Sequence, residues 1–287
     1  MSSHKIFLSG SEQKLGFRVR EGTITGHRHT RKLMNNQDAH FRDIAEINGK
    51  RYLYGAVSDG CSLEGKVNVR GQRVRTEVGA VLLCSFIRSE IPALIASHTP
   101  LNLFPQNLYH RCISYLANIS RTTTIGPPQR QWDFIERNLL ATILGFVMDD
   151  QKLIVFGAGD GMVIVNDEIN AIDQNNRPIY IAYHLLDREM LEKGVADSLP
   201  DCFNWSIYST QETQRFAICT DGIEDMWKKD PKSINGIWDH EPNAPKGLQW
   251  WLKIGSNGNH FGDDCTIIAG DRISEEKGGE LEYEGDS

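Results

Sequence analysis

The sequence YLYGAVSDG, residues 52–60, is an apolar run that ends abruptly in a serine, an acid and a glycine. A short apolar run bounded by turn residues is typical of a buried strand. Such a strand would deliver Asp59 into a turn, and the glycine beside it lets the backbone approach closely whatever the carboxylate holds. This stretch therefore predicts an acid placed with precision at the end of a core strand.

The same arrangement, an apolar strand followed by an aspartate beside glycine, recurs at Gly159-Asp160-Gly161 and at Thr220-Asp221-Gly222. Gly262-Asp263-Asp264 is a variant that precedes its strand, and Gln37-Asp38-Ala39 is a further acid among small or polar residues. A single aspartate at a strand end is usually only a turn former. Four or five gathered at one sheet edge would repel one another strongly unless cations lay between them. Carboxylates with backbone carbonyls suit hard ions such as Mg²⁺ or Mn²⁺, and no histidines or cysteines have the spacing of a zinc site.

Apolar periodicity predicts the remaining elements. We expect a helix over residues 67–97 that is broken or bent at Pro92, with Val74, Val78, Val81, Leu82 and Phe86 on one face. A second helix is expected over residues 108–119, followed by a loop over residues 122–131. Strands are expected at residues 138–148 and 152–156, which flank a compact hairpin at 149–151, and then at 162–165, 215–219 and 265–269.

Five blocks of the sequence carry a resemblance to a known family. They are Asn36-Gln37-Asp38-Ala39, Val57-Ser58-Asp59-Gly60, Gly157-Ala158-Gly159-Asp160, Thr220-Asp221-Gly222-Ile223-Glu224-Asp225 and Asp263-Asp264-Cys265-Thr266. Each block alone is a weak signal, but all five in this order resemble the metal-dependent protein serine/threonine phosphatases, the type 2C class, and within it the compact bacterial-like branch. The resemblance implies an α+β fold, a four-layer α-β-β-α sandwich of two antiparallel sheets flanked by helices.

The resemblance also implies roles for individual residues. Asp59 would bridge two divalent cations, Mn²⁺ or Mg²⁺, and the Gly60 carbonyl would bind one of them. Asp221 and Asp263 would bind the other. Asp38 would hold metal-bound water or bind directly, and the catalytic residues would be Asp38, Asp59 and Asp221.

Two further acids complete the expected set. Asp225 would act like Asp38, as a metal ligand or as a holder of metal-bound water, and Asp160 matches a position that supports a third ion in some members. A water shared by two cations would attack phosphorus in line with the departing serine or threonine oxygen, so that no phosphoenzyme forms.

The chain departs from the family pattern at two positions. Cys61 stands where many eukaryotic members have a histidine proposed to protonate the leaving oxygen, so the general acid is left unassigned. The phosphate-binding arginine does not align cleanly either. We take Arg31, with His29 nearby, as the candidate for binding substrate phosphate; the alternative is that this basic patch is a solvated strand edge.

Domain organisation follows from the span of the matching blocks. Residues 1–273 are expected to form a single catalytic domain. Within it, residues 167–214 would form an irregular, flap-like excursion that faces the substrate, or a surface insertion with no role. Residues 274–287 are expected to be an acidic, disordered tail, because the segment has too little apolar content to pack.

Composition bounds the setting of the protein. The net charge is −7, and residues 271–287 hold seven acids and two bases, so the rest of the chain is nearly balanced. No basic stripe favours nucleic-acid binding. Six scattered cysteines suit a reducing compartment. The apolar runs fall short of a membrane span, and no signal peptide is evident. We therefore expect a cytoplasmic monomer without membrane contact that acts on phosphorylated proteins and opposes a serine/threonine kinase.

Two alternatives compete with the phosphoprotein phosphatase. A pseudophosphatase would keep the fold and bind phosphorylated segments without turnover, and it would lack a metal ligand, whereas Asp59, Asp221 and Asp263 are all present. A phosphatase acting on a small-metabolite phosphoester stays open from the sequence.

Overall fold

The computed structural model describes residues 15–61, 75, 77–172, 178–191, 195, 197–238 and 247–273. The expected acidic tail, residues 274–287, lies outside this part of the chain. The strands are β1 (Phe17–Ile24), β2 (Asp38–Ile47), β3 (Lys50–Asp59), β4 (Ile143–Met148), β5 (Lys152–Ala158), β6 (Gly161–Val165), β7 (Glu168–Ile172), β8 (Asn204–Ser209), β9 (Arg215–Cys219) and β10 (Cys265–Arg272). The α-helices are α2 (His27–Arg31), α3 (Glu77–Ala96), α4 (Phe104–Thr123), α5 (Pro128–Asn138), α6 (Glu224–Lys229) and α7 (Gly247–Asn257).

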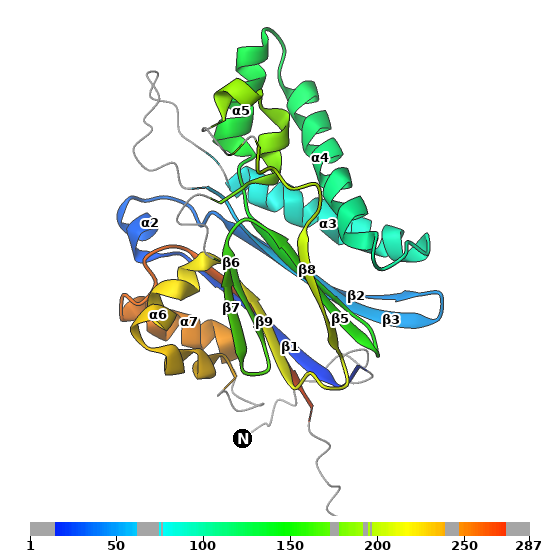
Figure 1. The fold of residues 1–287 in the computed structure, drawn as a ribbon. Coiled ribbons are helices and arrows are strands. Elements are labelled where there is room, and N and C mark those ends of the chain that lie inside the picture. Colours follow the sequence, from blue (N-terminus) through cyan, green and yellow to red (C-terminus); the bar gives the residue numbers. More distant parts are fainter. Residues whose placement is uncertain are drawn as a thin grey trace, which may run out of the picture.

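The strands form two antiparallel sheets that pack face to face (Figure 1). One sheet has the order β1-β10-β9-β6-β7 and the other the order β2-β3-β4-β5-β8. Apolar side chains from both sheets fill the space between them, among them Phe146, Phe216 and Ile268, which are fully buried. Burial of these side chains, each worth about 1.5–3 kcal/mol relative to exposure, holds the sheets together.

Helices cover both outer faces. Helix α3 lies on β2 and β3, with α4 and α5 beside it, and α7 lies on β1 on the opposite side of the molecule (Figure 1). Separate apolar cores fill the two helix–sheet interfaces. The predicted α+β class and the four-layer α-β-β-α sandwich are confirmed.

Helix α3 differs from the sequence-based prediction in its continuity and in its buried face. Pro92 lies inside one continuous helix, so the predicted break is wrong, and the predicted apolar face is wrong as well, because Val78 and Val81 are 36% and 52% exposed. The buried face instead contains Leu83, Ile87 and Leu94. Packing of this face onto the sheet outweighs the cost of about 3 kcal/mol that a proline imposes inside a helix. The predicted start of this helix, residues 67–74, lies outside the described residues.

Helix α3 also bears on the expectation that no apolar run is long enough to span a membrane. Its length and mean hydropathy of 1.7 meet the requirement by length and composition alone. A core helix passes the same test, and α3 packs its buried face on the sheet.

The other helix and hairpin predictions hold in outline. Helix α4 is longer than the predicted segment and ends at Thr123, and α5 begins at Pro128, a residue suited to a first helical turn, so the predicted loop over residues 122–131 is shorter than expected. The predicted hairpin between β4 and β5 is confirmed, and the Asp149 carboxylate accepts hydrogen bonds from the backbone N–H groups of Gln151 and Lys152.

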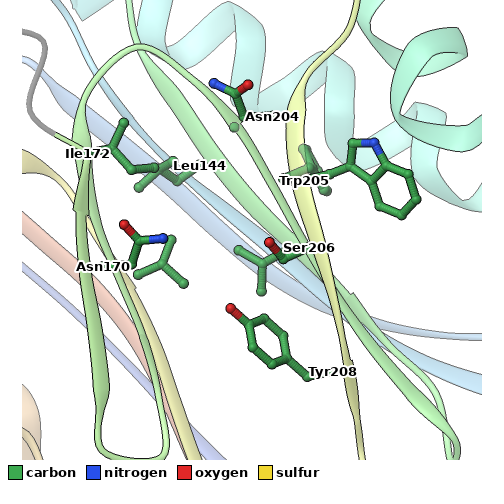
Figure 2. Close-up of a pocket in the computed structure, with 11 residues that line it drawn as sticks. Leu144, Asn170, Ile172, Asn204, Trp205, Ser206 and Tyr208 are labelled. Carbon is green, nitrogen blue, oxygen red and sulfur yellow. The ribbon is translucent and has the colours of Figure 1, made fainter.

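The segment expected to form a flap has a paired strand near each end. At its start β7 pairs with β6, and near its end β8 pairs with β5. Between these two edge strands the sandwich is open, and a cavity of about 230 Å³ separates them, with Asn170 and Ile172 on one side and Trp205, Ser206 and Tyr208 on the other (Figure 2). Between β7 and β8, the described residues 178–191 contain two short 3-10 helices, Ile181–Leu185 and Arg188–Met190.

Candidate metal centre

Two of the acids are positioned by neighbouring strands. Asp38 is the first residue of β2 and Asp59 the last of β3, and the antiparallel register places them directly opposite each other. Thr142, just before β4, fixes the end of β3, because its backbone N–H donates to the Asp59 carbonyl at 2.8 Å and its hydroxyl accepts from the Asp59 N–H at 3.2 Å. These two hydrogen bonds fix the position of Asp59 relative to the start of β4.

Three more acids approach from the other elements. Asp160 lies in the two-residue turn between β5 and β6, Asp221 follows β9, and Asp263 precedes β10. The charges of Asp38, Asp221 and Asp263 all act on Asp59, and the charge of Asp160 acts on Asp221. The structure thus gathers at one end of the sandwich five of the six acids that the sequence predicted for one site.

Glycines make the close approach of these segments possible. A side chain at Gly222 would place its Cβ atom 1.9 Å from the Asp264 carbonyl oxygen, and one at Gly26 would place it 2.2 Å from the Asp263 carbonyl carbon. Both distances are far inside van der Waals contact, so only glycine fits at these crossings. The Asp-Gly pair at 221–222 is therefore required by packing as well as by the chemistry of the acid.

The electrostatics of the site oppose ionisation. Burial raises the pKa of Asp38 from 3.8 to about 7; the charge of Asp264 adds to this, while hydrogen bonds from Thr266 and Thr220 act against it. Burial, followed by the charge of Asp38, raises the pKa of Asp59 well above its ordinary value. Burial, followed by the charge of Asp160, does the same to Asp221. Such a cluster is stable in its ionised form only when positive charge is supplied.

The residues of the cluster fit a divalent cation. Asp38 Oδ1 and Asp221 Oδ1 are buried and accept no hydrogen bond from the part of the chain that the structure describes. An acceptor left in this state costs about 1–3 kcal/mol. The donor set around them consists of oxygens, which is the set that Mg²⁺ and Mn²⁺ prefer.

The remaining predicted residues lie around this cluster. Gly60 follows Asp59, and its N–H donates to the Gln37 carbonyl at 3.1 Å. Asp225 lies on α6, where its Oδ2 atom would be 2.5 Å from a Cβ atom built on Gly262, the residue before Asp263. Asp225 therefore borders the segment that carries Asp263.

The two residues predicted to bind substrate phosphate have different surroundings. Arg31 is exposed at the end of α2. His29 is 2% exposed, and its ring lies between two acids, with Nδ1 2.9 Å from Asp264 Oδ2 and Nε2 3.5 Å from Asp263 Oδ1. Burial lowers the pKa of His29, but the hydrogen bond with Asp264 and the charges of Asp264, Asp263 and Asp38 outweigh it, so the pKa is raised. His29 is thus committed to these carboxylates and does not face an open surface.

Sequence reasoning missed several residues of the site. Thr220 donates its hydroxyl proton to Asp38 Oδ2 at 2.8 Å and accepts the Thr266 N–H at 2.9 Å. Tyr180 is buried, forms a hydrogen bond with Cys61 and lies near Asp59 and Asp160. Thr220 carried a signal, a polar residue between a buried cysteine and an acid, whereas Tyr180 lies in an irregular segment that no pattern marks.

All six cysteines are free, as expected from their spacing. Burial raises the pKa of the thiols at Cys84, Cys112, Cys219 and Cys265 above the ordinary value. These four cysteines therefore serve as small apolar core residues.

Comparison with known proteins agrees with this geometry. Among solved structures, a bacterial serine phosphatase has 15% identity and a TM-score of 0.56, with 89% of this chain and 98% of that chain covered. Stp1, a serine/threonine phosphatase from Staphylococcus aureus, has 15% identity and a TM-score of 0.55, with 89% and 94% covered. The catalytic domain of the serine/threonine phosphatase PstP, solved with two manganese ions, has 14% identity and a TM-score of 0.50, with 89% and 97% covered. No curated protein matches the chain.

At these identities the solved structures show the shared fold, and the family follows from the sequence itself. A family model described as protein phosphatase 2C matches residues 25–253, most of the chain. The match includes Asp38, Asp59, Asp160 and Asp221, four of the five acids gathered at the end of the sandwich. The predicted family and the predicted enzyme class, a protein serine/threonine phosphatase, are confirmed. On its fold, its acid cluster and this match, the chain belongs to the protein phosphatase 2C family.

Proposed function

We propose that this protein hydrolyses phosphoserine and phosphothreonine in other proteins with the help of two divalent cations, Mn²⁺ or Mg²⁺. The observation that carries the proposal is the convergence of five acids from separate elements, two of which hold buried oxygens with no hydrogen-bond donor. When bound, such cations lower the pKa of water and neutralise the charge that develops on the phosphoryl group.

Each acid of the cluster would have its own role in holding the cations. Asp59 and the Gly60 carbonyl, at the end of β3, would hold one cation, and Asp221 and Asp263 would hold the second, with Asp59 between the two. Asp38 is fixed by its hydrogen bond from Thr220 and leaves its Oδ1 atom available for a cation or its water. Asp225 would support the same centre, and Asp160, whose charge acts on Asp221, would take part in a third site.

Arg31 is the residue we propose for the incoming phosphate, because it is exposed on α2, the helix that also carries His29. For His29 we propose a supporting role in place of phosphate binding, since its ring is enclosed by Asp263 and Asp264. The substrates we propose are phosphorylated proteins. We also propose that the protein is a monomeric cytoplasmic enzyme that opposes a serine/threonine kinase.

The test is phosphate release from phosphoserine, phosphothreonine and phosphotyrosine peptides and from small phosphomonoesters, with and without Mn²⁺ or Mg²⁺. We expect turnover of the first two peptides only when metal is present, and its loss with EDTA. Tight binding of a phosphopeptide without turnover at saturating metal would support the pseudophosphatase instead. Faster turnover of small esters than of every peptide would support the small-metabolite enzyme.

A further inference from the structure

Asp264, the residue after the predicted metal ligand Asp263, points into the protein. Its side chain is 1% exposed. Its Oδ1 atom accepts a hydrogen bond from the Gly26 N–H at 2.8 Å, and its Oδ2 atom accepts one from the Gln37 N–H at 2.6 Å. The His29 Nδ1 atom lies 2.9 Å from the same Oδ2 atom. Both carboxylate oxygens are therefore occupied by groups of the chain itself.

These contacts exclude one interpretation of the cluster. His29, Asp263 and Asp264 each offer a ligand atom within 4.8 Å of the others, which is a spacing that could hold an ion. Backbone N–H groups, however, already point at both oxygens of Asp264, and a cation there would face those donors. The carboxylate is thus a hydrogen-bond acceptor for the backbone, and hydrogen bonds to a charged acceptor are about twice as strong as neutral ones.

The two backbone donors lie at the two ends of one segment. Residues 25–37 connect β1 to β2 and contain α2, and the single carboxylate of Asp264 holds the second and the last residue of this connection. His29 lies within the connection and reaches the same carboxylate from its middle. Asp264 therefore fixes the shape of the whole connection from one point.

This arrangement extends directly to the metal centre. Gln37 donates its N–H to Asp264, and its carbonyl accepts the N–H of Gly60 at 3.1 Å. The next residue, Asp38, lies opposite Asp59. Gly222 packs against the Asp264 carbonyl, and this contact fixes the position of the segment that begins with Asp221 relative to Asp264.

We propose that Asp264 is a positioning residue that holds the ligand-bearing segments at Asp38, Asp59-Gly60 and Asp263 in the geometry that binds the cations. The inference rests on the proposed metal-dependent function. Asp264 does not touch the cations in this assignment; it acts through the backbone of Gln37 and through its own neighbour. Outer-shell groups of this kind typically change metal affinity by about 10- to 100-fold when they are replaced.

The experiment compares Asp264→Asn with Asp271→Asn. Asp271 is a matched control, because it also lies on the segment that contains β10 and forms two ion pairs, with Arg18 and Arg20 at 2.6 Å each, at the end of the strand remote from Asp263. Mn²⁺ binding to each metal-free protein is measured by calorimetry and by the electron paramagnetic resonance signal of free Mn²⁺, and thermal unfolding is measured alongside.

We expect Asp264→Asn to weaken Mn²⁺ binding by at least about 10-fold, because the amide cannot accept at both positions. Asp271→Asn should lower the unfolding temperature and leave Mn²⁺ affinity unchanged. Equal Mn²⁺ affinity in Asp264→Asn and the unsubstituted protein, or equal loss in both variants, would overturn the assignment.

Two further outcomes keep the inference separate from the proposed function. Should Asp264→Asn not fold, Asp264→Glu keeps a carboxylate at this position but displaces its oxygens from the Gly26 and Gln37 N–H groups. A several-fold loss of Mn²⁺ affinity in this variant supports the assignment, and an unchanged Mn²⁺ affinity overturns it. Mn²⁺ binding by the unsubstituted protein without phosphate release would refute the phosphatase proposal while leaving the role of Asp264 supported by the variant comparison.

Discussion

Asp38 and Asp59 lie directly opposite each other across β2 and β3, at the end of the sandwich where Asp221 and Asp263 also gather. Burial and the charges of their neighbours raise the pKa of both carboxyl groups. The fold therefore pairs two acids at a place where burial opposes the ionisation of both. We expect both the stability and the activity of the protein to depend on whether a cation lies between them.

Divalent cations should stabilise the protein. At a free Mn²⁺ concentration 100 times the dissociation constant, binding to the folded state alone contributes about 2.7 kcal/mol, which corresponds to a rise of roughly 5 °C in unfolding temperature for a chain of this size. Differential scanning calorimetry of the protein in EDTA and in excess Mn²⁺ measures this rise. Ca²⁺ or Zn²⁺ producing a larger rise than Mn²⁺ and Mg²⁺ would contradict the predicted preference.

The metal-free protein should lose stability as the pH rises. The pKa of Asp38 is raised from 3.8 to about 7, so the folded state holds a proton that the unfolded state has already released. The contribution is complete below pH about 4 and disappears as the pH passes about 7. Urea unfolding in EDTA at several pH values should show this slope. Asp38→Asn should reduce it, and an unchanged slope in that variant would contradict the assignment.

Removing a metal ligand should abolish turnover with little effect on folding. We expect Asp59→Ala and Asp221→Ala each to lower kcat/KM by at least about 100-fold, since bound metals supply several kcal/mol of transition-state stabilisation. The control is Asp43→Ala, a change on β2 that removes an exposed ion pair with Arg88. Steady-state assays with a phosphothreonine peptide measure the effect, and full activity in either ligand variant would reject the site.

Cys61 should prove dispensable for proton transfer. It occupies the position of a proposed general acid in many relatives, but in this chain it forms a hydrogen bond with the buried Tyr180. We expect Cys61→Ser, which can keep that hydrogen bond, to change kcat by less than about 10-fold, whereas loss of a general acid costs at least ~100-fold. The pH–rate profile provides the second readout, and a basic limb that vanishes in Cys61→Ser would assign the thiol as the acid.

The candidate metal ligands could be found in the sequence because each of these acids sits beside a glycine or another small or polar residue, which is a local pattern. Asp59 and Asp221 could be found in this way, and their convergence followed from the family resemblance. Asp264 could not, since its hydrogen bonds to Gln37 and Gly26 join residues 227 and 238 positions apart. Contacts of that range leave no mark on periodicity.

The errors in the predicted helices have a similar cause. Apolar residues occur on nearly every face of α3, so the sequence did not reveal that Leu83 and Ile87 face the sheet while Val81 faces outward. The packing of this helix on the sheet also keeps it continuous through Pro92, where the local preference of proline alone predicted a break. Strand β8 was missed because four of its six residues are exposed, which gives no alternation of buried and exposed positions.

The open side of the sandwich between β7 and β8 has a consequence for the solution behaviour of the protein. Strand β8 pairs with β5 alone among the described strands, and its sequence, NWSIYS, holds neither a charge nor a proline. Trp205 and Ile207 are 40% and 42% exposed on it. Charges and prolines are the usual guards against intermolecular strand addition. This uncharged edge strand is thus where we expect aggregation between copies of the protein to begin.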